Sequence, residues 1–417
     1  MMAYKYGIKT DVKESISQAP VSTESCLVFF GNPYNSAAES GKAIRCNNYK
    51  EYLNKFHSGS TPTKELSLDI AAKLALSTVD HVWIVNCASS GSTTEVANNK
   101  IQNALEPALN SIVLNSSERP NIICIPALNE RGATNRADLL AELARLCHGG
   151  ICGRYSAFAL VDVDQSDSQV DSNGNADAEH ITKVCTDGYI KNCWGYTILE
   201  RDEDGAPSAM CNASIIGAIK LAEQDGRNTG GVPYRSLGNL LCNNVKGLCI
   251  RYVSSDQTHT EEINGVQDNI TEVVKKGIDS FINSGNSQWR TWGDHTSAFI
   301  DGGVFDELYR FDSTVRVMIH LANRFIDKWQ NVIDSPMTLQ LRNDILAEET
   351  NYLNYCLSIG ALIGDPVCEF KPTENITDTL QQGQFYFTNI YTVVIPAKFV
   401  QMNLQWTNAG LSAYIEQ

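Results

Sequence analysis

The stretch HVWIVNCASSGSTTEVANNKIQNALEPALNSIVLNSSERPNIICI, residues 81–125, sets the pattern of this chain. Its apolar runs at 81–87 and 121–125 have the length of buried strands, and residues 94–109 between them have the length and composition of a helix. Apolar strands separated by a helix are typical of a parallel sheet that is covered on both faces.

The same alternation extends in both directions from this unit. Further strands are expected at 26–30, 155–163, 194–200 and 247–253, and further helices at 135–147, 178–192 and 209–224. The predicted fold class is therefore α/β, with a mostly parallel sheet flanked by helices. Asp162 and Asp164 end one strand at the expected carboxyl edge of the sheet, where ligands often bind.

Residues 292–417 follow a different plan: a Trp-Gly turn, a helix over 313–330, a Gly-rich hinge and two alternating strands. The last strand alternates apolar side chains with amides, which gives it one apolar face. Its apolar residues are Val400, Met402, Leu404 and Trp406.

The N-terminus carries a second alternating segment, with no hairpin partner beside it in the sequence. Its apolar or aromatic residues are Tyr4, Tyr6, Ile8 and Val12. Both chain ends are thus predicted to pair with something else.

Composition limits the class of protein. The 417 residues are 43% apolar and 19% charged, as in globular proteins, and suffice for two domains. The net charge of −15 argues against direct binding of nucleic acid. No apolar run approaches the roughly 18 residues needed to span a membrane, so no membrane insertion is expected. The N-terminal residues lack the apolar core of a signal peptide, which predicts cytoplasmic synthesis.

Motifs for catalysis or cofactor binding are incomplete or missing. Lys42 follows a glycine but lacks the rest of a phosphate loop, and neither GxSxG nor HExxH occurs. The acidic loop at 164–177 aligns poorly with a calcium loop, since Gln169 falls at the first ligand position and His180 at the last. No catalytic residue, metal or cofactor is predicted.

The helix at 313–330 has a basic stripe on one side. Arg316, His320, Arg324 and Lys328 recur every four residues. In an acidic protein this stripe is a candidate docking face for an acidic partner, and the alternative is a solvated face.

Thirteen cysteines are many for a chain made in a reducing compartment, and none has CxxC spacing. Three of them, Cys87, Cys124 and Cys249, lie in apolar strands and are expected to be buried. Five lie in polar or Gly-containing segments and are expected to be exposed: Cys46, Cys147, Cys152, Cys242 and Cys368.

Several segments, in order along the chain, resemble those of contractile-tail sheath proteins, the family of myophages, R-type pyocins and related injection systems. They are YGIKTDVKE, CLVFFGNPYNSA, AIRCNNYKEYLNKFHSG, YSAFALVDVD and SAMCNASIIGAIKLAEQDGRNTGGVPYRSLGN. The C-terminal matches are the most specific: the turn at 292–296 (with His295 where Arg is usual), Arg316, the Gly-rich run at 360–364, Asn375, Gly383 and Pro396-Ala397.

The resemblance implies an architecture: an N-terminal linker arm (1–20) that packs with the C-terminal domain, an outer α/β domain (21–290) and an inner α+β domain (291–417) with a C-terminal arm. Exchanged terminal strands would complete the inner domain. It also implies a function: stacked hexameric rings around a tail tube, which contract to drive the tube through a cell envelope and deliver a genome or effector.

The implied partners are copies of this chain, the tail tube protein, and baseplate and tail terminator proteins. The implied location is the tail of a virion assembled in the host cytoplasm. The basic stripe would face the tube. Exposed thiols at Cys46, Cys242 and Cys368 could oxidise into inter-subunit disulfides after release, the alternative being buried, inert thiols. Two other functions stay open, a hydrolase-like α/β enzyme with an oligomerisation tail and another tail or baseplate component.

Overall fold

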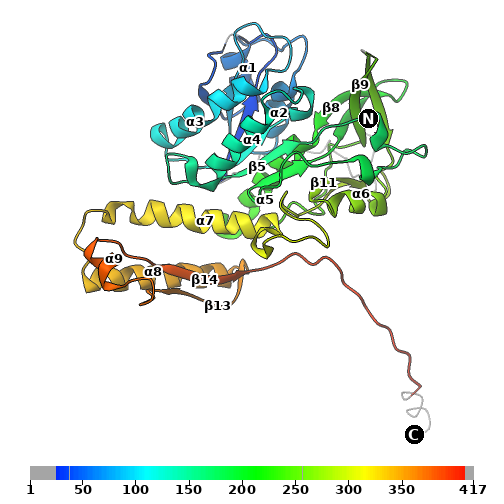
Figure 1. The fold of residues 1–417 in the computed structure, drawn as a ribbon. Helices are drawn as coiled ribbons and strands as arrows, with labels where there is room; N and C mark the ends of the chain where they lie inside the picture. Colours follow the sequence, from blue (N-terminus) through cyan, green and yellow to red (C-terminus); the bar gives the residue numbers. More distant parts are fainter. Residues whose placement is uncertain (1–24, 37, 256, 409–417) are drawn as a thin grey trace, which may run out of the picture.

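An eight-stranded sheet forms the centre of the molecule (Figure 1). The structure, a computed structural model, describes residues 25–36, 38–255 and 257–408. The strand order is β12 (Trp289–Trp292), β11 (Ile278–Asn283), β6 (Ile190–Cys193), β5 (Phe158–Asp162), β4 (Pro120–Ile125), β1 (Cys26–Gly31), β3 (Val82–Asn86) and β2 (Ala43–Cys46). Neighbours from β11 to β3 run parallel, and only the edge strands β12 and β2 are antiparallel. The prediction of a mostly parallel sheet is confirmed.

Helices cover both faces of this sheet, because successive side chains of a strand point to opposite sides. In β1, Leu27 and Phe29 pack in one core cluster with α1, α2 and α5, whereas Val28 and Phe30 pack in another with α3 and α4. This strand is therefore apolar on both of its faces. The helices are α1 (Tyr49–Phe56), α2 (Ser67–Ala75), α3 (Asn98–Asn115), α4 (Arg136–Arg145) and α5 (Ala213–Arg227).

A second, antiparallel sheet has the order β10 (Gln257–Ile263), β9 (Gly247–Ser254), β7 (Tyr196–Arg201) and β8 (Pro207–Asn212). The sequence predicted β7 and β9 as strands but placed them in the parallel sheet, which is wrong. An apolar run reports burial, and it does not report which sheet the strand joins. The helix α6 (Gln267–Val274) precedes β11.

The predicted helix at 178–192 is also wrong. The segment holds a short 3-10 turn at Ala178–His180 and then β6. Lys191 and Asn192 are polar but fully buried in β6, so that this strand lacks the apolar signature of its neighbours.

The C-terminal part adds a layer beneath the α/β body (Figure 1). It contains α7 (Asp312–Trp329), α8 (Leu339–Ser358), α9 (Thr377–Gln381) and a two-stranded sheet of β13 (Leu362–Glu369) and β14 (Thr388–Val393). Val315 and Ile319 of α7 join the main core, while Val317 and Leu321 join a separate cluster with α8 and the hairpin. α7 is thus shared by both layers. The expected domain boundary at 290/291 falls inside β12.

Past β14, residues 394–408 run without assigned helix or strand and extend away from the body (Figure 1). We call this segment the arm. In the part of the chain that the structure describes, no helix combines the length and apolarity needed to cross a membrane.

Candidate functional site

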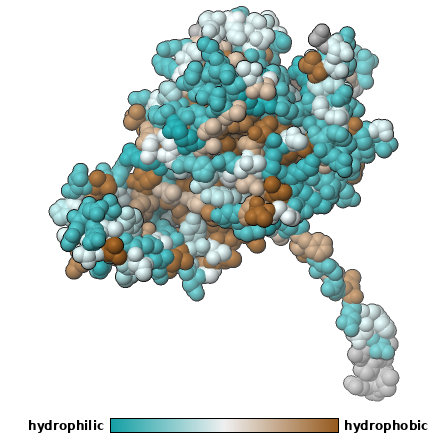
Figure 2. Space-filling view, viewed as in Figure 1, coloured by the Kyte–Doolittle hydropathy of each residue, from teal (hydrophilic) through white to brown (hydrophobic). Residues whose placement is uncertain are grey.

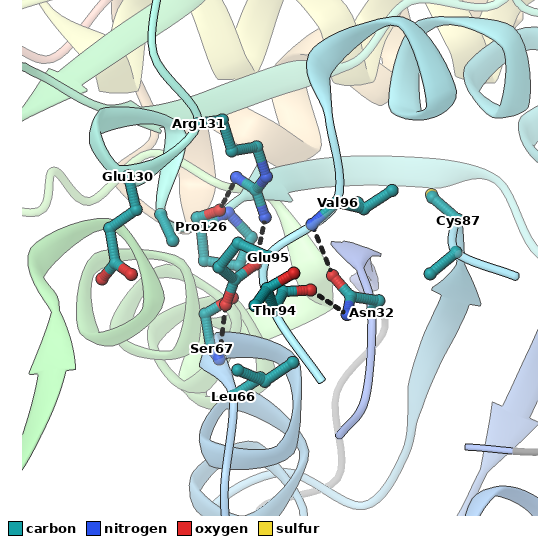
Figure 3. A network of polar contacts seen from close by, with 12 residues as sticks. Asn32, Leu66, Ser67, Cys87, Thr94, Glu95, Val96, Pro126, Glu130 and Arg131 are labelled. Carbon is teal, nitrogen blue, oxygen red and sulfur yellow. Dashed lines mark hydrogen bonds and ion pairs between the residues drawn. The ribbon is translucent and has the colours of Figure 1, made fainter. Parts of the chain in front are cut away.

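The carboxyl edge of the parallel sheet, the usual ligand site of α/β enzymes, is filled by a polar network (Figure 3). Glu95 accepts a hydrogen bond from the backbone N–H of Ser67, the first residue of α2, at 2.9 Å. The guanidinium of Arg131 pairs with the other oxygen of Glu95 at 2.8 Å. Asn32, just past β1, accepts from the backbone N–H of Val96 at 2.8 Å and so holds the Glu95 segment in place.

Asp162, at the end of β5, makes the equivalent arrangement at the start of α5. Its carboxylate accepts from the N–H of Ser214 at 3.0 Å, from the Ser214 hydroxyl at 2.7 Å and from the N–H of Ala127 at 2.9 Å. Burial raises the pKa of Asp162 to about 7. Asp164 instead pairs with Arg136.

Helix N-termini attract anions, because their first N–H groups lack partners inside the helix. Here the starts of α2 and α5 receive carboxylates of the chain itself, Glu95 and Asp162. The positions that would hold a substrate or phosphate in an enzyme thus stabilise the fold instead. A cavity of about 800 Å³ lies beside this edge, and its lining groups also pair with one another, as Tyr196 does with Glu130. Among the described residues, no group of three or more His, Cys, Asp or Glu side chains is arranged to hold a metal ion.

The basic stripe on α7 is paired within the chain. Arg316 is 4% exposed and forms an ion pair with Asp225, which also accepts from the hydroxyl of Ser25 at 2.5 Å. The imidazole of His320 lies 2.7 Å from the hydroxyl of Tyr352 on α8, and burial lowers the pKa of His320 to about 4. In the subunit, Arg316 is thus buried and His320 only partly exposed, whereas a docking face or a solvated face needs accessible side chains.

The rest of the stripe forms a polar seam with α8. Arg324 pairs with the buried carboxylate of Glu349 at 2.9 Å, and Trp329 donates to the same carboxylate at 2.7 Å. Lys328 pairs with Glu348 at 2.8 Å. The side chain of Lys328 is 45% exposed and that of Arg324 is 18% exposed, and a tube-facing role of the stripe stays a prediction. We call these contacts the α7–α8 seam.

No other described part of the chain covers the apolar residues of the arm. Val400, Met402, Leu404 and Trp406 are 84%, 79%, 89% and 81% exposed. Figure 2 shows the arm as a thin segment of mixed hydropathy outside the body. The expected strand is therefore not paired within the described chain. The N-terminal set, Tyr4, Tyr6, Ile8 and Val12, lies outside the described residues.

The two-stranded sheet offers open edges. β13 and β14 pair with each other, from Leu362 with Val393 to Glu369 with Thr388. Among residues 25–36, 38–255 and 257–408, no further strand joins either outer edge. The sequence missed β13, because a proline and a glycine interrupt its alternation.

The Trp-Gly turn covers a group of buried charges. The ammonium of Lys191 lies 3.0 Å from the carboxylate of Asp312, pairs with Asp279 and donates to the carbonyl of His295 at 2.9 Å. Burial alone would lower the pKa of Lys191, but these carboxylates raise it. The ring of His295 stacks on Phe299, and burial lowers the pKa of His295 to about 3. The imidazole at this position is therefore neutral.

Most cysteines predicted to be exposed are buried, so that prediction is wrong. Cys46, Cys147, Cys242 and Cys368 are 0%, 0%, 3% and 5% exposed, and only Cys152 is partly exposed. Burial raises the pKa of Cys46 to about 12 and that of Cys242 and Cys368 to about 11. All cysteines in the described residues are free thiols. In the folded subunit the thiols of Cys46, Cys242 and Cys368 are thus protonated and shielded, which disfavours disulfide formation.

No family model and no curated protein sequence matches this chain. Solved structures do match. A chain of the anti-feeding prophage baseplate, determined by cryo-EM, covers 97% of this chain and 100% of its own length, with a TM-score of 0.66 and 17% identity. This chain has the sheath-protein fold. The contracted sheath complex of the PVC extracellular contractile injection system matches with a TM-score of 0.64 and 16% identity, over 99% of this chain and 100% of its own.

The sheath-protein fold also includes a tail sheath protein from Desulfitobacterium hafniense. Its crystal structure matches with a TM-score of 0.54 and 12% identity, over 93% of this chain and 100% of its own. The matches span both sheets of the α/β body and the C-terminal layer together. The resemblance seen in the sequence is thus confirmed at the level of the fold.

Proposed function

We propose that this chain is a sheath subunit that polymerises as stacked hexameric rings around a tail tube and contracts to drive the tube through a target envelope. The observation that carries the proposal is that, among the described residues, the alternating arm is exposed and no further strand joins the outer edges of the two-stranded sheet. The full-length match to sheath proteins supports it.

Strand exchange supplies the assembly chemistry. The apolar arm residues add to the β13–β14 sheet of a neighbour by β-augmentation, and the N-terminal segment adds to the other edge. Each exchanged strand forms main-chain hydrogen bonds and buries apolar side chains that are exposed in the free subunit. Such links persist while rigid bodies rotate past one another, as contraction requires. The extended sheath is then a metastable state, and contraction releases its stored energy.

Deletion tests this scheme. A variant without residues 399–417 and a variant without residues 1–14 should both stay folded, because the core of the described residues is formed by other parts of the chain. Both should fail to form tubes, as seen by negative-stain electron microscopy, with folding checked by circular dichroism. Normal tubes from either variant would contradict the proposed exchange of that arm.

A second candidate is a structural baseplate component, since two similar chains come from baseplate structures of the anti-feeding prophage. Micrographs of the purified protein distinguish the two roles. Long tubes favour the sheath subunit, and single closed rings favour the baseplate component.

A further inference from the structure

The arm is fastened to the body at one point near its start. After β14, the N–H of Val394 donates to the carbonyl of Ala361 at 3.2 Å, and the chain then crosses to the Trp-Gly turn. There the ammonium of Lys398 pairs with the carboxylate of Asp294. Every described residue from Phe399 onward is exposed. The ion pair thus marks the boundary between the crossing part of the arm and its exposed part.

The charges around Asp294 explain why a cation is needed there. Its side chain is 4% exposed, and the neighbouring buried carboxylates, Asp279 and Asp312, already share Lys191. Among the described residues, the basic groups within 4.0 Å of Asp294 are Lys398 and His295. His295 is neutral, so Lys398 compensates this buried carboxylate.

The Trp-Gly turn that carries Asp294 packs against the main sheet and α7. Gly293 has a φ of +122°, and a Cβ there would lie 2.2 Å from Asp279, so the turn passes directly against the buried charges. The carbonyl of Asp294 accepts from the N–H of Asp312, the first residue of α7, at 2.9 Å. The position of Asp294 is thus fixed by both the main sheet and α7.

We propose that the Lys398–Asp294 pair is the pivot of the arm: it fixes the point from which residues 399–408 leave the subunit toward a second copy. This rests on the proposed arm exchange and names the residues that position it. A shorter tether raises the effective concentration of the strand at its acceptor edge, which falls as about the −3/2 power of tether length. Lys398 is accordingly a positioning residue for assembly.

The direct test measures how freely the arm moves in the monomer. Fluorophores on noncanonical amino acids at Gln267, exposed at the start of α6, and at Gln401 leave the native thiols untouched. In Lys398→Gln the free tether to residue 401 grows from three residues to seven, counted from Val394. Because chain dimensions scale with the square root of length, the distance distribution should widen about 1.5-fold.

Two variants control for charge and for general loosening. Lys398→Arg keeps the cation, so its distribution of distances between the two labels should be as narrow as that of the wild type. Lys371→Gln removes a different partly exposed ion pair, with Glu374, in the same layer and should also leave the width unchanged. An unchanged distribution in Lys398→Gln overturns the pivot.

Assembly kinetics provide the second readout and separate the two proposals. Lys398→Gln should polymerise about 3.6-fold more slowly in light scattering, from the −3/2 power of the seven-to-three ratio of tether lengths. An unchanged rate would overturn the positioning role. The variant without residues 399–417 tests the exchange itself. If this variant polymerises normally, the proposed arm exchange is wrong, whatever the measured distance distributions show.

Discussion

At the scale of residues, the chain uses carboxylates where an enzyme would bind a ligand. Glu95 and Asp162 lie at the starts of two helices on the carboxyl edge of the sheet, and each accepts backbone N–H groups. Both are nearly buried, and burial raises the pKa of each. Their hydrogen bonds offset part of the cost of desolvation.

Asp162 should therefore leave a signature in the pH dependence of stability. Its folded pKa, about 7, lies above the unfolded value near 4, so the folded protein retains a proton that the unfolded chain has lost. The free energy of unfolding should fall as pH rises from about 4 to about 7, by at most about 1.4 kcal/mol per pH unit from this group. Asp162→Asn should remove that part of the pH dependence, which urea titrations at several pH values measure as the free energy of unfolding.

Asp171→Asn is a matched control for this experiment. Asp171 is partly exposed, and hydrogen bonds from Asn175 and Asn173 lower its pKa, so its linkage lies below pH 4 and has the opposite sign. If the free energy of unfolding of Asp162→Asn changes with pH as that of the wild type does, Asp162 is ionised at neutral pH.

At the scale of elements, α7 joins the two layers. Its apolar side chains pack in both cores, and the α7–α8 seam provides its polar contacts. Glu349 is 1% exposed and holds both Arg324 and Trp329. Glu349→Ala leaves a guanidinium without its buried partner and should lower the free energy of unfolding by about 2–4 kcal/mol.

Glu348 is the neighbouring control, since it pairs with Lys328 on the surface. Glu348→Ala should cost less than about 1 kcal/mol, because exposed ion pairs contribute little. Urea unfolding followed by tryptophan fluorescence compares the two. Equal losses in the free energy of unfolding would mean that the burial of Glu349 does not strengthen its ion pair.

Sequence patterns predicted elements where one physical force dominated. The central strands are apolar along most of their length because both faces are covered, so β1, β3, β4 and β5 were predicted close to their observed places. β6 was missed because Lys191 is buried through ion pairs with Asp279 and Asp312, which lie 88 and 121 residues away in the sequence, and no local pattern reports such partners.

The candidate site was predictable where its pattern is local in the sequence, and not where it depends on distant partners. The alternation of Val400, Met402, Leu404 and Trp406 is visible in the sequence, and the structure leaves these residues uncovered. The stripe on α7 had the right spacing, but its partners on α8 were hidden, because charge patterns do not show which surface another helix will cover. Asp294 was noticed only as part of the Trp-Gly turn, and its pairing with Lys398 depends on the fold.

At the scale of the whole molecule, Trp406 reports on assembly. The protein has six tryptophans, all in the described part, and only Trp406 is exposed, at 81%. Strand exchange should bury the face of the arm that carries Trp406. Acrylamide should therefore quench the tryptophan fluorescence of the monomer more strongly than that of the assembled tube. Trp406→Phe should abolish the difference. Equal quenching of monomer and tube in the wild type would place Trp406 in solvent after assembly.

The open edges of β13 and β14 also bear on how a stack of subunits can stop growing. A donated arm and an accepting edge are different structures, so a stack that passes arms in one direction has two chemically distinct ends. One end retains unused edges and the other retains unused arms. Each end therefore requires its own cap: an extended strand at the first, and a sheet with a free edge at the second. The polarity of the whole assembly would thus follow from a hairpin of two strands.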